Sequence, residues 1–303
     1  MGTRNYSLSR QMTKAGRIAL NDACKKGDLS FSSVDSIGQR WTSFCEYAKK
    51  HDINRMEKIT RDFVIQYGKE LAAKIQAGEL TTSTAQNAVS AVNTVLKIVP
   101  ASWKTVSPVH DCGIGQRTNV RSVAPTKNDA YLDAKQALSD RPREFALVSL
   151  CRELGLRSKE GSLLNARKAY TEAIRTRAIS ITLGTKGGRS RTIPITSTAQ
   201  LDALKTAAAV QGRGKSIMPP DKNWRQWREG GLRHARETVG GLHELRAAYA
   251  CDRYKQLTGF DAPAVAGHRE AGKADDYHAR EILSAELGHG RTDVLVSYVG
   301  SSK

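Results

Sequence analysis

The chain is 303 residues long, which is enough for about two domains. Hydrophobic residues make up 39% of it, so it can bury a core, and a wholly disordered chain is excluded. No apolar run approaches the roughly 18 residues needed to cross a bilayer. Residues 1–17 are polar and basic, with no apolar signal segment. We therefore expect a cytoplasmic protein with no membrane partner.

The cysteines exclude two further classes of protein. Five cysteines are spread over the chain without any C-x-x-C pair, so the sequence predicts neither a disulfide framework nor a zinc site. These residues are Cys24, Cys45, Cys112, Cys151 and Cys251.

The charge indicates a polyanionic partner. Lys and Arg number 48 against 30 Asp and Glu, a formal net charge of +18, and the surplus is present in both halves of the chain. Nucleic acid is the leading candidate, because Lys and Arg that neutralise phosphates supply most non-specific affinity. The alternative is a basic protein whose charges are simply solvated.

The first part of the chain is predicted to be helical. Apolar residues recur there at mixed three- and four-residue spacing, in the segments Ser7–Lys26, Ser33–His51, Thr60–Gln76 and Thr82–Ile98. Prolines and glycines cluster after the last of these segments. We therefore expect an N-terminal helical domain over 1–105, a linker over 106–126 and a second domain over 127–303.

The second part is predicted to be mainly α-helical with one small β-hairpin. The strands are Ala178–Leu183 and Arg191–Ile195, and the turn between them is GTKGGRS, with Lys186 at its tip. The helical patterns are Asn128–Leu138, Arg143–Leu154, Ser197–Val210, Gly230–Thr258 with a break at Gly240 and Gly241, Tyr277–Leu287 and a last stretch at Thr292–Tyr298. Residues 263–272 are expected to form a loop.

Four short segments carry side chains suited to phosphate chemistry. Taken singly, each has an ordinary structural explanation, because long charged side chains mostly lie exposed. The segments are GLRSKE with Arg157, the hairpin tip with Lys186, a helix with His243 and Arg246 three residues apart, and His289 nine residues before Tyr298.

Together these side chains could surround one phosphodiester. The planar guanidinium groups of Arg157 and Arg246 match the non-bridging oxygens and would stabilise transition-state charge. Tyr298 would be the nucleophile, with a histidine as base. Lys186 could protonate the leaving 5′ oxygen. The sequence has no acidic cluster typical of a two-metal site, so we expect neither a metal nor another cofactor.

In order and spacing these segments resemble the tyrosine recombinases, the phage-type integrases. The resemblance covers most of the chain. GLRSKE at 155–160 is similar to the motif of the first catalytic arginine with its accompanying acid, and TLGTKGGRSRTIPI at 182–195 to the hairpin that presents the catalytic lysine. LHELRAAYA at 242–250 is similar to the His-x-x-Arg helix, and LGHGRTDVLVSYVG at 287–300 to the His-then-Tyr motif.

The resemblance implies a fold and a set of roles. The N-terminal helical domain would clamp DNA, and the second domain would be catalytic. Glu160 would orient a neighbouring catalytic side chain, and Tyr298 would form a 3′-phosphotyrosyl link. The residues that activate the scissile phosphate would be Arg157, Lys186, His243, Arg246 and His289.

The resemblance also implies partners. Members of the family recombine double-stranded DNA at specific sites without ATP or metal, usually as homotetramers on two paired sites. DNA-bending accessory proteins are further expected partners. The protein would work at the nucleoid of a bacterium.

A second tyrosine competes with Tyr298 for the role of nucleophile. Residues 259–276 look like an insertion, and within this region His268 precedes Tyr277 by the same nine residues. We favour Tyr298, because apolar residues around it would anchor its segment. Asp275 and Asp276 would oppose the approach of a phosphate to Tyr277.

Two other functions fit part of the same pattern. A type IB topoisomerase-like nicking-closing enzyme would share the arginine, lysine, histidine and tyrosine chemistry. A DNA-binding architectural protein with a decayed catalytic set is the non-enzymatic alternative. The small N-terminal helical domain favours the recombinase over the first, and the completeness of the set favours it over the second.

Overall fold

The computed structural model describes residues 4–99, 102–126 and 128–302, so residues 1 and 127, where the two expected domains begin, lie outside the described residues. The chain forms two compact units, Met1–Thr118 and Asn119–Lys303. None of the described helices is both long enough and apolar enough to cross a bilayer. The fold is mainly helical with one small antiparallel sheet, which confirms the predicted fold class.

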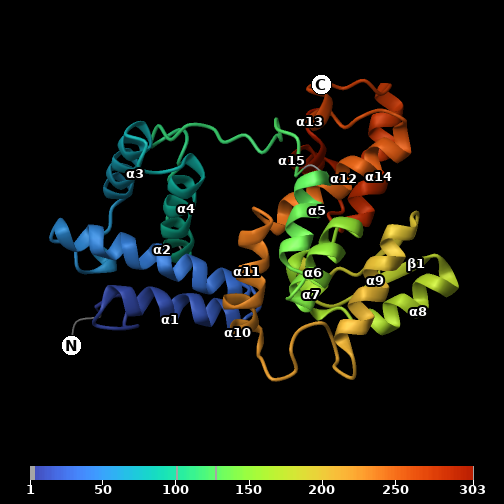
Figure 1. The fold of residues 1–303 in the computed structure, drawn as a ribbon. Helices are drawn as coiled ribbons and strands as arrows, with labels where there is room; N and C mark the ends of the chain where they lie inside the picture. Colours follow the sequence, from blue (N-terminus) through green and yellow to red (C-terminus); the bar gives the residue numbers. More distant parts are fainter. Residues whose placement is uncertain (1–3, 100–101, 127, 303) are drawn as a thin grey trace. The chain divides into compact units, whose positions relative to one another are not determined.

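The first unit consists of helices, as predicted (Figure 1). They are α1 (Met12–Lys25), α2 (Phe31–Lys50), the 3-10 turn η1 (Met56–Lys58), α3 (Arg61–Gln76) and α4 (Thr82–Ile98). Helix α1 begins at Met12 and not at Ser7. Ser7 has a φ of 65°, and Asn5 and Tyr6 also have positive φ, which is incompatible with an α-helix.

Aromatic side chains fill the core of this unit. Trp41 and Phe44 of α2 are fully buried, and the Trp41 indole donates to the carbonyl of Met12 at 3.2 Å, which fixes α2 against α1. Buried polar groups inside a core are paired in this way, since an unpaired donor there would be costly.

The expected linker over 106–126 is corrected by the structure. Its first half packs into the core of the first unit, where Val106, Cys112 and Ile114 are buried. The Asn93 side chain of α4 donates to the Val106 carbonyl at 2.8 Å and accepts from the Val106 amide at 3.0 Å. The Pro- and Gly-containing composition therefore marks an irregular segment, but this part of it is tied down by buried hydrogen bonds.

The second unit consists of packed helices with a β-hairpin at one edge, beside α8 (Figure 1). Its elements are α5 (Asn128–Ala137), α6 (Pro142–Glu153), α7 (Ser158–Leu163), α8 (Ala166–Thr176), β1 (Ala178–Ile181), η2 (Lys186–Gly188), β2 (Arg191–Pro194), α9 (Thr198–Gln211), α10 (Trp224–Glu229), α11 (Gly231–Thr238), α12 (Leu242–Thr258), α13 (Pro263–Ala266), α14 (Lys273–Glu286), η3 (Thr292–Leu295) and α15 (Val296–Val299).

The predicted hairpin and the break at Gly240 and Gly241 are confirmed. Strands β1 and β2 pair antiparallel, with Ile179 opposite Ile193 and Ile181 opposite Arg191. Helix α8 was not predicted; its buried stripe consists of the small residues Ala166, Ala169 and Ala173. Residues 263–266, expected as loop, form the short helix α13.

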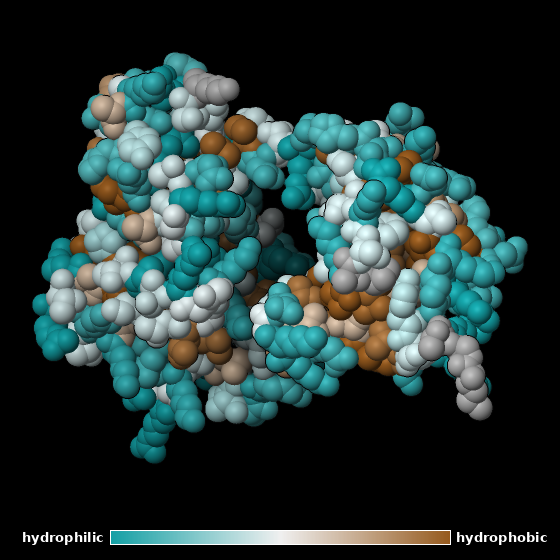
Figure 2. All heavy atoms as spheres, turned by 180° about the vertical axis from the view of Figure 1, so that it is seen from behind, coloured by the Kyte–Doolittle hydropathy of each residue, from teal (hydrophilic) through white to brown (hydrophobic). Residues whose placement is uncertain are grey.

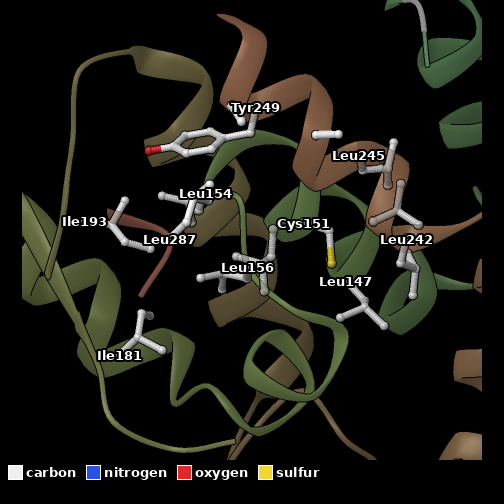
Figure 3. Packing of buried hydrophobic residues seen from close by; sticks show 14 of the residues in the cluster. Leu147, Cys151, Leu154, Leu156, Ile181, Ile193, Leu242, Leu245, Tyr249 and Leu287 are labelled. Carbon is white, nitrogen blue, oxygen red and sulfur yellow. The ribbon is translucent and has the colours of Figure 1, made fainter. Parts of the chain in front are cut away.

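The core of the second unit lies directly behind the predicted motifs (Figure 3). Leu154 and Leu156 flank Gly155, Leu242 and Leu245 flank the His243 position, and Leu287 precedes Gly288; all of these leucines are buried. Because apolar burial is worth roughly 25 cal/mol per Å², these leucines hold the backbone of each motif in place. The backbone positions of the polar motif residues are thereby fixed by the buried leucines next to them.

The face of the molecule drawn in Figure 2 is mostly hydrophilic. On the face drawn in Figure 2, teal residues dominate and hydrophobic residues are confined to limited patches. This agrees with a chain that carries a net charge of +18.

Candidate active site

A buried carboxylate, Glu160, organises the predicted motifs. It lies in α7 with 1% of its surface exposed. One oxygen accepts from the backbone amide of Arg157 at 2.7 Å and the other from the Arg157 guanidinium at 2.7 Å. The Arg191 guanidinium forks onto the same two oxygens at 2.8 and 2.7 Å. The carboxylate thus satisfies two arginines at once, in the paired geometry that guanidinium groups favour.

The arginines keep Glu160 ionised. Burial alone would raise its pKa, but the hydrogen bonds and charge of Arg191, with those of Arg157, outweigh burial and lower the pKa to about 2. Such a group is charged at every physiological pH.

Arg191 was not among the predicted site residues. It begins β2 on the face that also carries the buried Ile193, and its own side chain is 3% exposed. Its Nε donates to the Glu286 carbonyl at 2.7 Å. A charged residue on the apolar face of a strand is a signal in the sequence, because buried charges need partners; the partner itself lies 31 residues away.

Arg246 is buried among groups from three other segments. It is 1% exposed and lies on α12. Its guanidinium donates to the carbonyls of Gly155 and Leu287, the latter at 2.5 Å, and its Nη1 lies 3.9 Å from a Glu160 oxygen. Burial lowers the pKa of Arg246 to about 10, so the group remains charged at neutral pH.

Tyr298 lies at the centre of the predicted histidines and of Arg246. It belongs to the four-residue helix α15 and is 3% exposed. Its hydroxyl oxygen lies 3.1 Å from His289 Nε2 and accepts from Arg246 Nε at 3.4 Å. The His243 ring lies 5.0 Å from the Tyr298 ring, measured between centroids.

Both histidines lie in surroundings that favour the neutral ring. Loss of solvent around the ring, together with the charges of Arg246 and Arg157, lowers the pKa of His289 to about 3. Burial, followed by the charges of Arg246 and Arg121, lowers the pKa of His243. A neutral imidazole whose Nε2 lacks a hydrogen can accept the phenol proton.

Gly288, the residue before His289, allows the Arg191 side chain to pack closely against the backbone. Its φ is +67°, and a Cβ at this position would lie 2.9 Å from Arg191 Cδ. Glycine therefore meets both the backbone and the space requirement. The Leu-Gly-His pattern of the sequence has this physical reason.

The structure does not bring Lys186 into this cluster. Lys186 is exposed in the hairpin turn, and within the described residues it makes no hydrogen bond or ion pair. The turn itself lies near the site, because Arg189 donates to the His289 carbonyl at 3.2 Å, and a Cβ on Gly184 would touch the Lys159 backbone at 2.9 Å.

Tyr277 lies away from the predicted side chains. It is 57% exposed on α14, and a hydrogen bond to Glu281 raises its pKa. None of the predicted histidines or arginines contacts it among the interactions of the described residues.

The side chains around Tyr298 carry an excess of positive charge. They include three guanidinium groups, on Arg157, Arg191 and Arg246, against the single carboxylate of Glu160. An anion such as a phosphate would balance the excess. Among the described residues, no group of three or more His, Cys, Asp or Glu side chains is arranged to hold a metal ion.

Comparison with known families and structures identifies the fold. Residues 116–252 match the family model described as "Integrase". No curated protein matches the sequence.

Solved structures of similar fold extend over nearly the whole chain. A lambda integrase dimer bound to a COC′ core site has a TM-score of 0.58 at 17% identity, covering 94% of this chain and 77% of that one. XerH site-specific recombinase bound to difH substrate has a TM-score of 0.57 at 14% identity, covering 94% and 82%. The Tn1549 transposon integrase in complex with circular intermediate DNA has a TM-score of 0.57 at 11% identity, covering 94% and 95%.

At these identities the structural likeness establishes the fold, and the family match covers the segment from Arg157 to Arg246. The chain is thus similar to the integrases over residues 116–252, and over nearly its whole length it has the fold of the tyrosine recombinases.

Proposed function

We propose that Tyr298 attacks a scissile phosphodiester of double-stranded DNA and forms a 3′-phosphotyrosyl link. The observation that carries this is the contact of one phenol oxygen with both His289 Nε2 at 3.1 Å and Arg246 Nε at 3.4 Å. A base and a cation on the same hydroxyl are what an activated oxygen nucleophile needs.

In the first step the Tyr298 oxygen bonds to phosphorus and the bond to the 5′ oxygen breaks. The phenol proton passes to His289. An approaching phosphate offsets the arginine charges that depress the proton affinity of this imidazole, so His289 becomes a better base when DNA is bound. The leaving 5′ oxygen takes a proton, and a second strand's 5′-hydroxyl later reverses the same step.

Arg157 and Arg246 would bind the non-bridging oxygens and stabilise the charge that grows on them. Both already share Glu160 as a neighbour, at 2.7 and 3.9 Å. In this proposal Glu160 and Arg191 act through these arginines by fixing their orientation. His243, beside the Tyr298 ring, would donate to the same phosphate.

Lys186 would supply the proton to the leaving 5′ oxygen. Its place in the hairpin turn supports this role, because Gly184 packs on the α7 backbone and Arg189 bonds to the His289 carbonyl. The turn that carries Lys186 is anchored on both sides, and we propose that contact with a DNA strand directs the lysine side chain toward the scissile phosphate.

The wider function that follows is site-specific recombination. We propose that the first unit clamps DNA, that four copies act on two paired sites, and that accessory proteins bend the DNA. A lambda integrase tetramer bound to a Holliday junction, of similar fold with a TM-score of 0.58, supports the tetramer. The net charge of +18 supports the DNA partner.

A covalent trap tests the nucleophile. A pool of duplexes of random sequence, each nicked so that a short strand diffuses away after cleavage, accumulates protein–DNA adducts that survive detergent. Tyr298→Phe should abolish the adduct and Tyr277→Phe should not. The reverse result would assign the nucleophile to Tyr277 and overturn the proposal.

A second assay separates recombination from simple nicking and closing. Sequencing the trapped duplexes should reveal a preferred site. Relaxation of a supercoiled plasmid that lacks this site, at the same rate as one that carries it, would favour a type IB topoisomerase-like activity.

A further inference from the structure

The backbone on which Tyr298 sits is held by an arginine far away in the sequence. Arg121 donates from its backbone amide to the Val296 carbonyl at 2.8 Å and from its Nε to the Ser297 carbonyl at 3.3 Å. The rest of its guanidinium forks onto Glu244 at 2.9 and 2.7 Å. Arg121 therefore donates hydrogen bonds to the carbonyls of both residues that precede Tyr298.

We propose that Arg121 is a positioning residue for the Tyr298 nucleophile. The proposal rests on the function proposed above for Tyr298. In this role Arg121 fixes the helix that carries the phenol against the helix that carries the other catalytic groups, and it does not touch the reacting phosphate.

The nucleophile helix needs such support because it is short. Helix α15 spans only Val296–Val299, and a single turn does not hold together by its own hydrogen bonds. The carbonyls of Val296 and Ser297 are among the last acceptors of this turn, which have no partner within the helix. Arg121 supplies donors to both.

The other end of the contact lies between two catalytic residues. Glu244 follows His243 and precedes Arg246 by two positions on α12. The hydrogen bond and charge of Arg121 lower the pKa of Glu244 and keep it ionised. The Arg121 side chain thus joins α12 directly to α15. The planar guanidinium, with two hydrogen bonds to Glu244, holds the two helices in a more fixed geometry than a lysine ammonium would.

Arg121 also lies near the junction of the two units. The second unit begins at Asn119, two residues before Arg121. Two residues after this junction the chain is hydrogen-bonded to the nucleophile helix.

A matched ion pair elsewhere in the second unit provides the control. Arg152 pairs with Asp252 at 2.6 Å. The two arginines are buried to a similar degree, with 11% of the Arg152 side chain exposed and 13% of the Arg121 side chain. Their partners are more exposed, Asp252 at 56% and Glu244 at 36%. Both pairs join an arginine to α12, but none of the hydrogen bonds of Arg152 goes to the residues around Tyr298. Arg152→Ala therefore removes an ion pair to α12 but leaves the hydrogen bonds to the backbone of α15 in place.

The experiment uses the full chain and the trapped-adduct duplex described above. Arg121→Ala should lower the single-turnover cleavage rate at saturating DNA by about tenfold to hundredfold, the cost of a displaced reacting group. The Kd for DNA and the melting temperature should stay close to those of Arg152→Ala. Arg121→Lys should not restore the rate, because an ammonium cannot fork. Hydrogen exchange of the amides at 296–301 should accelerate in Arg121→Ala.

Glu244→Gln gives a second route if Arg121→Ala folds poorly. It keeps both backbone contacts of Arg121 but removes the charged partner, so its cleavage rate should fall less than that of Arg121→Lys. Wild-type cleavage by Arg121→Ala, or equal losses in Arg121→Ala and Arg152→Ala, would overturn the positioning role. An adduct that persists in Tyr298→Phe would instead overturn the proposed function.

Discussion

The Nε2 atom of His289 lies 3.1 Å from the hydroxyl oxygen of Tyr298, nine residues further along the chain. The contact is possible because Gly288 turns the backbone with a φ of +67° and α15 returns the tyrosine toward α12. The motif spacing seen in the sequence therefore corresponds to a direct hydrogen bond.

Loss of Arg157 should affect cleavage far more than binding. Its guanidinium is 22% exposed and contacts Glu160, so Arg157→Ala leaves the fold largely intact. We expect the cleavage rate to fall by about 10² to 10³, as for other lost transition-state donors. Single-turnover adduct formation measures this, and DNA binding should persist with a steep dependence on salt. Full cleavage by the variant would contradict the role assigned to Arg157.

Glu160 should make folding stability sensitive to acid. Its folded pKa, about 2, lies below the ordinary value of 4.5, so its contribution is complete above about pH 4.5 and is lost as the pH falls toward 2. The difference corresponds to about 3 kcal/mol. Urea unfolding at pH 6 and pH 3 should show a steeper loss in the wild type than in Glu160→Gln. If the free energy of unfolding falls equally in the wild type and in Glu160→Gln between pH 6 and pH 3, Glu160 is not the source of the acid sensitivity.

Glu160→Gln should also be less stable than the wild type at pH 6. The variant leaves the buried Arg191 without its carboxylate, and breaking a buried ion pair costs about 3–5 kcal/mol. The same urea experiment measures this difference.

His289 should remain neutral over the physiological range. Its pKa of about 3 means that the folded protein does not protonate this ring between pH 8 and pH 5, whereas an exposed histidine would titrate near 6.5. The ring-proton chemical shift of His289, assigned with His289→Gln, should stay constant in this range. Titration near 6.5 in the DNA-free protein would show that the arginine charges do not reach the ring.

A buried ion pair behind the site should contribute strongly to stability. The Nε of Arg280 donates to both carboxylate oxygens of Asp276, at 3.0 and 2.9 Å, and its Nη1 donates to the Gly300 carbonyl at 3.2 Å. Arg280→Leu leaves the buried Asp276 without its cationic partner and, among the described residues, with only the hydrogen bond from the Tyr254 hydroxyl at 2.8 Å, which should cost about 3–5 kcal/mol. Urea unfolding measures the loss, and the exposed pair of Arg233 and Glu237 serves as the control, with an expected loss below about 1 kcal/mol.

Adding Asp276→Asn to Arg280→Leu should recover part of the stability, because the unpaired charge is removed. A double variant less stable than Arg280→Leu would show that the loss comes from packing and not from charge.

The sequence was most informative where one helix or one short segment carries the pattern. His243 and Arg246 lie three residues apart on α12, and buried leucines on either side fix the helix. His289 and Tyr298 follow a regular helix and a glycine. Helical periodicity relates His243 to Arg246, and the nine-residue spacing relates His289 to Tyr298. The order of the segments and their resemblance to the tyrosine recombinases then predicted that all four groups would share a site.

Arg191 and Arg121 were missed for a different reason. Their partners lie 31 and 123 residues away, so no local pattern identifies them. Arg121 was assigned to a linker, because the surrounding prolines and glycines predict irregular structure and say nothing of tertiary hydrogen bonds. Long-range pairing of charges is set by packing, which periodicity alone does not specify.

The phenol of Tyr298 is almost fully enclosed, with 3% of the residue exposed. An ester formed on this oxygen would start from a position that bulk water does not reach. Hydrolysis of the ester would leave a permanent nick, whereas the hydroxyl of a base-paired strand reseals the break. If Tyr298 is the nucleophile, as we propose, its enclosure would favour faithful resealing over strand damage.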